Sequence, residues 1–116
     1  MPIISVTGVI ETGELPVIEN LLSSWLNKPG ELEVRSRSIG GQVQYSDDTW
    51  DVSCYKTDEG PRFYLSVTLQ GTLEMAGASL KKLWHLCHQK GIPCQLDYIE
   101  QNEDGDDVGE EFSVTG

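Results

Sequence analysis

The side chains best suited to bind a metal lie close together near residue 90 of the chain. His85, Cys87 and His88 fall within four residues, and Cys94 comes six residues later. Zinc takes four nitrogen or sulfur ligands in a tetrahedron, so these two cysteines and two histidines would complete one site. On a helix that advances about 100° per residue, however, the side chains point in different directions. The spacing favours buried cysteines and surface histidines, and a zinc site is the alternative.

The same residues could form a cysteine–histidine nucleophile pair, but their spacing argues against catalysis. Neighbouring residues on a helix do not face each other, and burial makes a thiol harder to deprotonate. The chain contains no G-x-S-x-G, H-E-x-x-H, G-x-x-x-x-G-K-[ST] or G-x-G-x-x-G motif, so the usual hydrolase and nucleotide-binding signatures are missing. We therefore predict no catalytic residue and no cofactor.

A second cluster of candidate ligands lies in the acidic segment that follows residue 99. Its spacing reproduces much of a calcium-binding loop, which places oxygen ligands at positions 1, 3, 5, 7 and 12 and a glycine at position 6. The residues at these positions are Glu100, Asn102, Asp104, Asp106, Glu111 and Gly105. The preceding segment alternates like a strand, however, whereas such a loop lies between two helices. We predict an acidic turn or loop over residues 100–111, with calcium binding as the alternative.

Two helices and several strands must position these side chains. Apolar residues in 15–27 recur at the spacing of an amphipathic helix, and Thr72 is a suitable N-cap for a second helix that runs to Lys90. Residues 2–10 are a β-branched run, and apolar residues alternate in 50–55, 62–70 and 94–99, which predicts strands. Further strands are expected over 31–39 and 42–45, with a hairpin turn at Gly40 and Gly41, and a short strand over 112–114.

The order of these elements predicts one α+β domain over residues 1–116. Two amphipathic helices can both bury their apolar stripes against a one-faced sheet only if they lie on the same side of it. We therefore expect a two-layer sandwich, with two helices on one face of an antiparallel or mixed sheet of about five strands. The element order resembles the ferredoxin-like β-α-β-β-α-β arrangement, which by itself implies no function.

The net charge of the chain is −11 at pH 7, from 19 acidic and 8 basic residues among 116. Residues 91–116 contain eight acids and no Lys or Arg, so the acidity is concentrated in this last segment. Binding nucleic acid through its phosphates requires clustered Lys and Arg, and we therefore predict no nucleic-acid partner. A local negative field instead steers basic proteins toward the chain and discriminates against other partners.

The sequence predicts a cytoplasmic protein with no membrane partner. No window approaches 18 consecutive apolar residues, and the first ten residues lack the basic start and the long apolar run of a signal peptide. Three cysteines cannot all pair within one chain, and a secreted scaffold of this size usually carries a larger, even set.

These observations predict a small, acidic, non-catalytic module that binds a basic protein, such as an inhibitor or immunity-type protein for a nuclease toxin. The alternative is a small cytoplasmic enzyme or a ligand- or metal-binding domain. Tyr55 and Tyr64 fall on the polar side of their strands, where aromatic residues are typical of interfaces. Cross-strand packing is the other explanation, and an uncovered apolar face would favour a homodimer. The predicted partner-binding residues are Glu100, Glu103, Asp104, Asp106, Asp107, Glu110, Glu111, Tyr55 and Tyr64.

Overall fold

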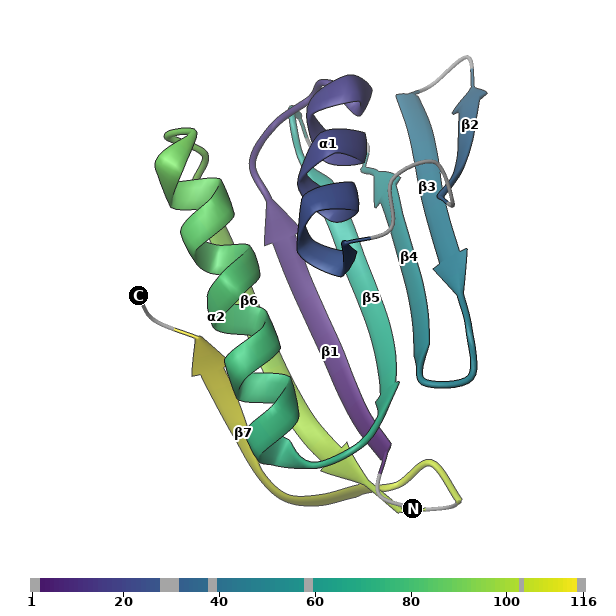
Figure 1. The fold of residues 1–116 in the computed structure, drawn as a ribbon, viewed down its shortest axis with the longest axis vertical. Coiled ribbons are helices and arrows are strands. Elements are labelled where there is room, and N and C mark those ends of the chain that lie inside the picture. The colour runs from purple at the N-terminus through teal and green to yellow at the C-terminus, as the bar shows by residue number, and fades with distance from the viewer. Residues whose placement is uncertain (1–2, 28–31, 38–39, 58–59, 103, 115–116) are drawn as a thin grey trace.

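In the part of the chain that the structure describes, seven strands form one sheet and two helices cover one of its faces (Figure 1). The computed structural model describes residues 3–27, 32–37, 40–57, 60–102 and 104–114, and for 33–37 and 40 it describes the backbone. The α+β class, the antiparallel sheet and the two helices are confirmed. The elements are β1 (Ile3–Ile10), α1 (Leu15–Leu26), β2 (Glu33–Arg37), β3 (Gly40–Ser46), β4 (Trp50–Lys56), β5 (Phe63–Gln70), α2 (Leu73–Gln89), β6 (Cys94–Gln101) and β7 (Asp107–Val114).

The expected sheet of about five strands is too small for the described residues, which form seven strands, and both edge strands have a weak apolar alternation. β7 starts at Asp107, well before the short strand predicted over 112–114, and it exposes every residue except Val114. β2 contains Val34 as its only apolar residue. An edge strand has a neighbour on one side only and is often marked by charged residues, so its sequence resembles that of a loop.

The strand order is β2-β3-β4-β5-β1-β6-β7, and every neighbouring pair is antiparallel. β5, α2 and β6 form a split β-α-β unit with β1 between the two strands, as in a ferredoxin-like sheet. α1 instead joins β1 to the edge strand β2, with β5, β4 and β3 in between. The strand order therefore differs from the predicted ferredoxin-like arrangement, because a meander of four strands follows α1 where that arrangement has two.

The predicted hairpin turn at Gly40 and Gly41 is wrong by two residues, because both glycines belong to β3 and pair with Arg37 and Ser36 of β2. The connection itself, residues 38–39, lies outside the described residues. A Cβ on Gly41 would lie 2.5 Å from a terminal methyl of Leu15, in the first turn of α1. Gly41 therefore lets α1 approach the sheet closely.

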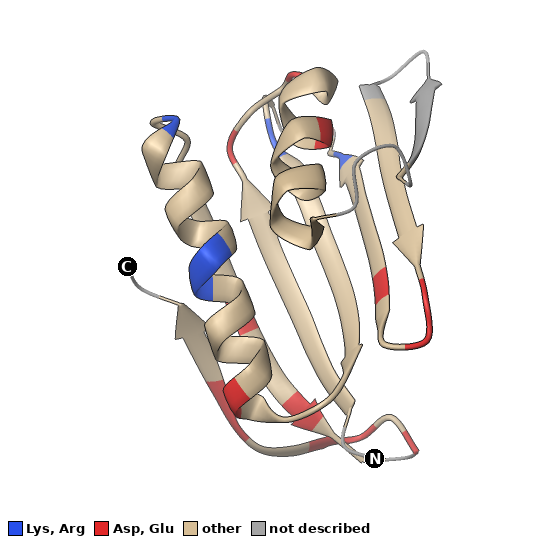
Figure 2. Cartoon of the chain, in the orientation of Figure 1, with Lys and Arg blue, Asp and Glu red and all other residues tan. Residues whose placement is uncertain are grey.

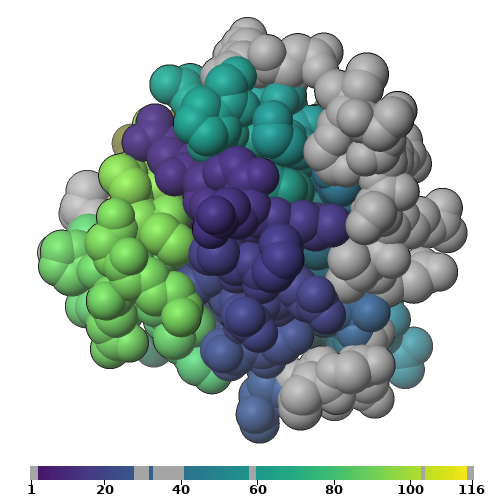
Figure 3. Space-filling view, turned by 90° about the horizontal axis from the view of Figure 1, so that it is seen from above, coloured from purple at the N-terminus to yellow at the C-terminus, as the bar shows by residue number. Residues whose placement is uncertain are grey.

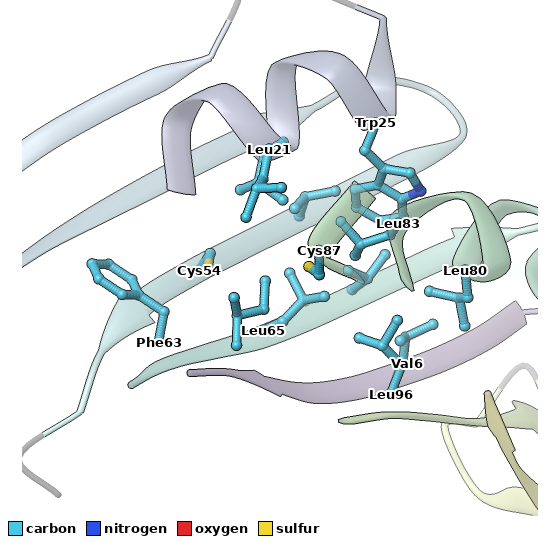
Figure 4. Packing of buried hydrophobic residues seen from close by; sticks show 14 of the residues in the cluster. Val6, Leu21, Trp25, Cys54, Phe63, Leu65, Leu80, Leu83, Cys87 and Leu96 are labelled. Atoms are coloured by element: carbon cyan, nitrogen blue, oxygen red, sulfur yellow. The ribbon is translucent and has the colours of Figure 1, made fainter. Parts of the chain in front are cut away.

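One face of each central strand meets the apolar stripes of both helices in a hydrophobic core (Figure 4). In β5, every second residue from Phe63 to Leu69 is buried and the residues between them are exposed. Leu21 of α1 and Leu83 of α2 point into the same space. No polar or charged residue among those described is buried, so the polar groups able to bind a ligand lie at the surface.

α2 is bounded by the residues that the sequence predicts. The hydroxyl oxygen of Thr72 accepts a hydrogen bond of 3.2 Å from the backbone N–H of Met75, which satisfies an N–H group that has no partner within the helix. At the other end, the N–H groups of Lys90 and Ile92 donate to the carbonyl oxygen of Cys87, at 3.1 and 2.9 Å. These bonds turn the chain sharply out of α2, which brings its last turn beside the start of β6.

Candidate functional site

The sheet face opposite the helices carries polar and mostly uncharged side chains. The strand register aligns them in two rows across the sheet. The first row consists of Gln42, Tyr55, Tyr64, Val9 and Gln95. The second row consists of Gln44, Ser53, Ser66, Thr7 and Asp97. Among the residues that β3, β4, β5, β1 and β6 contribute to these two rows, Asp97 carries the one charge, while the register continues the rows to Arg35 and Glu33 of β2.

Tyr55 and Tyr64 form a stacked pair in the middle of the first row. Their ring centroids are 6.0 Å apart and their planes differ by 18°. The two residues are 44% and 41% exposed, so each ring packs on its neighbour and still presents area to solvent. A rigid tyrosine offers a large contact area at a small entropic cost, which is why tyrosine is common in protein-binding surfaces.

A shallow groove runs along β1 beside this tyrosine pair. Its first part has a volume of about 200 Å³ and its second part about 400 Å³, and the two parts share Val9 and Gln95. Tyr64 and Asp97 line the first part together with Thr7 and Gly8. The second part extends to the end of the sheet, where it is lined by Glu11, Arg62, Pro93 and Cys94.

Asp97 and Tyr64 give the first part of the groove a specific chemistry. The Ser113 hydroxyl donates a hydrogen bond of 2.5 Å to Oδ1 of Asp97, which holds the carboxylate in place on β6. A lysine or arginine side chain in the groove would meet this carboxylate and the exposed ring of Tyr64. Both groups attract cations, through charge-assisted hydrogen bonding and through the ring quadrupole. The groove is therefore suited to a basic side chain.

Acidic side chains gather at one end of the molecule, which we call the acidic end (Figure 2). The β3–β4 turn, the first turn of α2 and the β6–β7 turn all reach this end (Figure 1). Its residues are Asp47, Asp48, Asp51, Glu74, Glu100, Asp104, Asp106 and Asp107. The last four belong to the predicted partner-binding set. The sequence alone does not predict the first four, because only the strand order places them at the same end of the molecule as the β6–β7 turn.

The remaining predicted acids lie away from this turn. Glu110 and Glu111 are exposed on the edge strand β7, and Glu103 lies outside the described residues. The described basic residues lie elsewhere, with Lys56 and Arg62 near the opposite end of the sheet and the lysines of α2 along the helix (Figure 2). Among the described residues, negative charge is therefore concentrated at the acidic end, whereas the opposite end carries both signs, as in the ion pair between Arg62 and Glu11.

The segment with calcium-loop spacing is the turn of a β-hairpin. Oδ1 of Asn102 accepts hydrogen bonds of 3.0 Å from the backbone N–H groups of Asp104 and Asp106. Glu100 belongs to β6 and Glu111 to β7, so only residues 102–106 form the connection between the strands. Because Asn102 uses its carbonyl oxygen to shape the turn, the spacing of these residues is explained without a cation.

The structure separates the two histidines from the two cysteines. The His88 ring stacks on Trp84 with centroids 4.8 Å apart, and His85 meets the same indole edge-on at 5.3 Å. Cys87 is fully buried in the core. Within the described ranges, no three His, Cys, Asp or Glu side chains come together as a metal site would require.

Burial of the Cys54 thiol makes the stability of the folded state depend on pH in the alkaline range. Burial raises the pKa of this thiol from 9.0 to about 12. Between these values the folded state binds more protons than the unfolded state, so stability falls as the pH rises through this window. We expect this thiol to contribute a decline in the free energy of unfolding of about 1.4 kcal/mol per pH unit, which Cys54→Ala should remove. Urea denaturation of both proteins across the window measures the two slopes, and equal slopes would contradict the assignment.

The chain matches no protein-family model and no curated protein. Neither helix in the described part of the chain has the length and apolar character of a membrane span. The function is therefore inferred from the surface of the molecule.

Proposed function

We propose that the chain is a non-catalytic protein-binding module whose groove and acidic end bind a basic protein. The observation that carries this proposal is the meeting of Tyr64 and Asp97 in one groove on the uncovered sheet face. The two groups form a subsite for a lysine or arginine side chain, next to a second exposed ring on Tyr55. Neither group needs a cofactor or a nucleophile to perform this role.

The acidic end supplies long-range attraction to the same partner. Its carboxylates are separated from the described lysines and arginines, so the molecule presents a negative field from one end (Figure 2). Such a field raises the rate of association with a positively charged protein and is screened by salt. Short-range contacts in the groove then determine how slowly the complex dissociates.

A nuclease or another nucleic-acid-binding protein has the chemistry that these surfaces require. Its binding site for phosphates is lined with Lys and Arg, which an acidic protein can cover. We therefore infer an inhibitor or immunity-type role against such a partner. The acidic end also makes self-association through that surface unfavourable, because like charges would face each other.

The test begins with affinity capture from the organism's own lysate at low and moderate salt, followed by binding kinetics with the protein that is retained. We expect Asp104→Asn with Asp106→Asn to slow association by roughly 5- to 10-fold at low salt, with a smaller effect at higher salt. Asp97→Asn and Tyr64→Ala should instead speed dissociation by about 10-fold each, because they remove buried interface contacts.

The matched control is Glu14→Gln with Glu19→Gln, which removes the same amount of charge from the helix-covered side of the molecule. Both glutamates are exposed, at the start of α1 and within it. This pair should leave association nearly unchanged. Equal slowing by the two pairs would mean that net charge alone acts, and unaltered dissociation in the groove variants would rule out the groove as the binding site.

A further inference from the structure

The outer edge of β7 is open in the part of the chain that the structure describes. β7 ends the strand order, with β6 as its neighbour on the inner side (Figure 1). Among the described residues, no backbone hydrogen bond joins residues 107–114 to any element other than β6. Such an edge presents a row of N–H and C=O groups that can pair with a further strand.

The support beneath β7 is held in place by the rest of the fold. β6 pairs with β1 along its whole length, and its start lies with the end of α2 against the segment that joins β1 to α1 (Figure 3). Tyr98 of β6 lies under α2, where a Cβ on Gly77 would be 2.9 Å from the tyrosine hydroxyl. Phe112 of β7 stacks on Tyr98, with ring centroids 5.5 Å apart. An added strand would therefore meet a preorganised edge, which lowers the cost of binding.

The apolar side chains of β7 lie on the helix-covered side of the sheet. Phe112 pairs with Tyr98, which α2 covers. Val108 pairs with Glu100, which in turn pairs with the buried Ile4 of β1, so Val108 lies on the same side. Phe112 and Val108 are 39% and 44% exposed, so both retain apolar area that a neighbouring strand could cover.

The side chains on the open side of β7 are polar or acidic. Ser113 bonds to Asp97 on that side, and alternation places Glu111 with it. Glu110 adds a second exposed carboxylate, and residues 91–116 contain no Lys or Arg. Like charges directly opposite each other destabilise a strand pair and opposite charges stabilise it. The edge therefore disfavours a second copy of itself and favours a basic strand.

A bulge limits how much of this edge can pair regularly. The register between β6 and β7 shifts between Tyr98 and Glu100, and Gly109 has a φ of 85° there. Bulges interrupt a ladder locally. The extended part beyond the bulge, residues 110–114, is about 17 Å long, which is an ordinary length for one strand.

We propose that β7 accepts an extended segment of the basic partner as a further strand of the sheet, a segment in which Lys or Arg alternates with apolar residues. Its basic side chains would lie beside Glu111 on the open side, and its apolar side chains beside Phe112 on the helix side. In this mode of recognition the backbone hydrogen bonds supply affinity and the alternate side chains supply specificity. The identity of the partner rests on the proposed function, but the edge of β7 is a different surface from the groove.

The test uses the wild-type full chain and the peptide acetyl-Lys-Val-Lys-Val-Lys-Val-Lys-amide. Heteronuclear NMR spectra give the Kd of the peptide and its location on the protein. At about ten times this Kd, amide hydrogen exchange should slow roughly 10-fold at the β7 amides that do not donate to β6, because exchange then occurs from the unbound fraction.

Two control peptides separate strand pairing from attraction by charge. Acetyl-Lys-Lys-Lys-Lys-Val-Val-Val-amide has the same composition and charge without the alternation. The alternating peptide with every backbone nitrogen methylated keeps the side chains and loses the backbone donors. Neither control should slow exchange on β7.

A pair of substitutions tests the charges. Glu110→Gln with Glu111→Gln should raise the Kd of the alternating peptide roughly 5-fold at low salt. Glu14→Gln with Glu19→Gln removes the same charge from the region of α1 and should change the Kd by less than about 2-fold.

The proposal is overturned if the alternating peptide leaves exchange on β7 unchanged, or if either control peptide slows it equally. Equal weakening by the two glutamine pairs would also overturn it, since net charge alone would then act. The groove is tested separately, by the dissociation of a protein partner from Asp97→Asn and Tyr64→Ala, so either surface can fail while the other holds.

Discussion

Trp25→Ala is expected to lower the free energy of unfolding by about 3–5 kcal/mol. Trp25 is only 3% exposed, although it lies near the end of α1. Its Nε1 donates a hydrogen bond of 2.8 Å to the carbonyl oxygen of Ser79 in α2. Its ring also meets the edge of Trp50 in β4, with centroids 5.4 Å apart and planes at 76°. This one side chain therefore ties α1 to both α2 and the sheet.

Urea denaturation followed by circular dichroism measures this loss, which is a large fraction of the roughly 5–15 kcal/mol typical of a domain. Trp25→Phe keeps an aromatic ring in the core and removes the hydrogen bond, so we expect a smaller cost of about 1–2 kcal/mol. Trp84→Ala removes an indole that is only half-buried and stacked on His88. If Trp84→Ala destabilised the chain as much as Trp25→Ala, the bridging role of Trp25 would be wrong.

The sequence predicts best those elements in which buried apolar residues recur regularly from one end to the other. α2 and β5 each bury one regular stripe against the core, and their patterns identify both elements and their ends. β2 and β7 lie at the edges, where one-sided pairing leaves little apolar signal. The hairpin turn is predicted at the wrong residues because Gly41 is not part of the turn. It lies in β3, where the absence of a side chain leaves room for Leu15 of α1.

The candidate sites depend on neighbours that are distant in sequence, and this limits their prediction. Alternation places Tyr55 and Tyr64 on the polar side of the sheet, as the structure has them. Nothing in the chain order indicates that Asp97 faces the same groove as Tyr64, since β6 reaches β5 only across β1. The gathering of Asp47, Asp48, Asp51 and Glu74 at the acidic end likewise requires the strand order.

The positions of Cys87 and Cys94 agree with the apolar patterns of the sequence. Cys87 falls in the apolar stripe of its helix, and Cys94 alternates with Leu96 on the core side of its strand. Only the short connection through Gly91 and Pro93 separates them. Cys87 is buried in the core, as its place in the stripe predicts, whereas the two histidines of the same helix are exposed.

Gly8→Ala is the second substitution for which we expect a large effect, a loss of about 2–3 kcal/mol in the free energy of unfolding. Gly8 lies opposite Leu96 in the β1–β6 ladder. A Cβ at this position would lie 2.7 Å from Cδ2 of Leu96 and 2.8 Å from the carbonyl oxygen of Gln95. Leu96 can rotate away, but the Gln95 oxygen is backbone, so β6 itself must shift from β1.

This shift has a consequence for the groove, because Gln95 and Asp97 of β6 line it opposite Tyr64 of β5. We therefore expect Gly8→Ala to accelerate amide hydrogen exchange along the β1–β6 ladder, which Thr7→Ala, on the exposed side of the same strand, should not do. Thr7→Ala should also change stability by no more than about 0.5 kcal/mol. Equal stability loss in the two variants would contradict the prediction, because the loss would then not depend on the close approach of β6 at Gly8. Loss in Gly8→Ala alone would show that the close approach of β6 to β1, and with it the width of the groove, depends on the missing side chain.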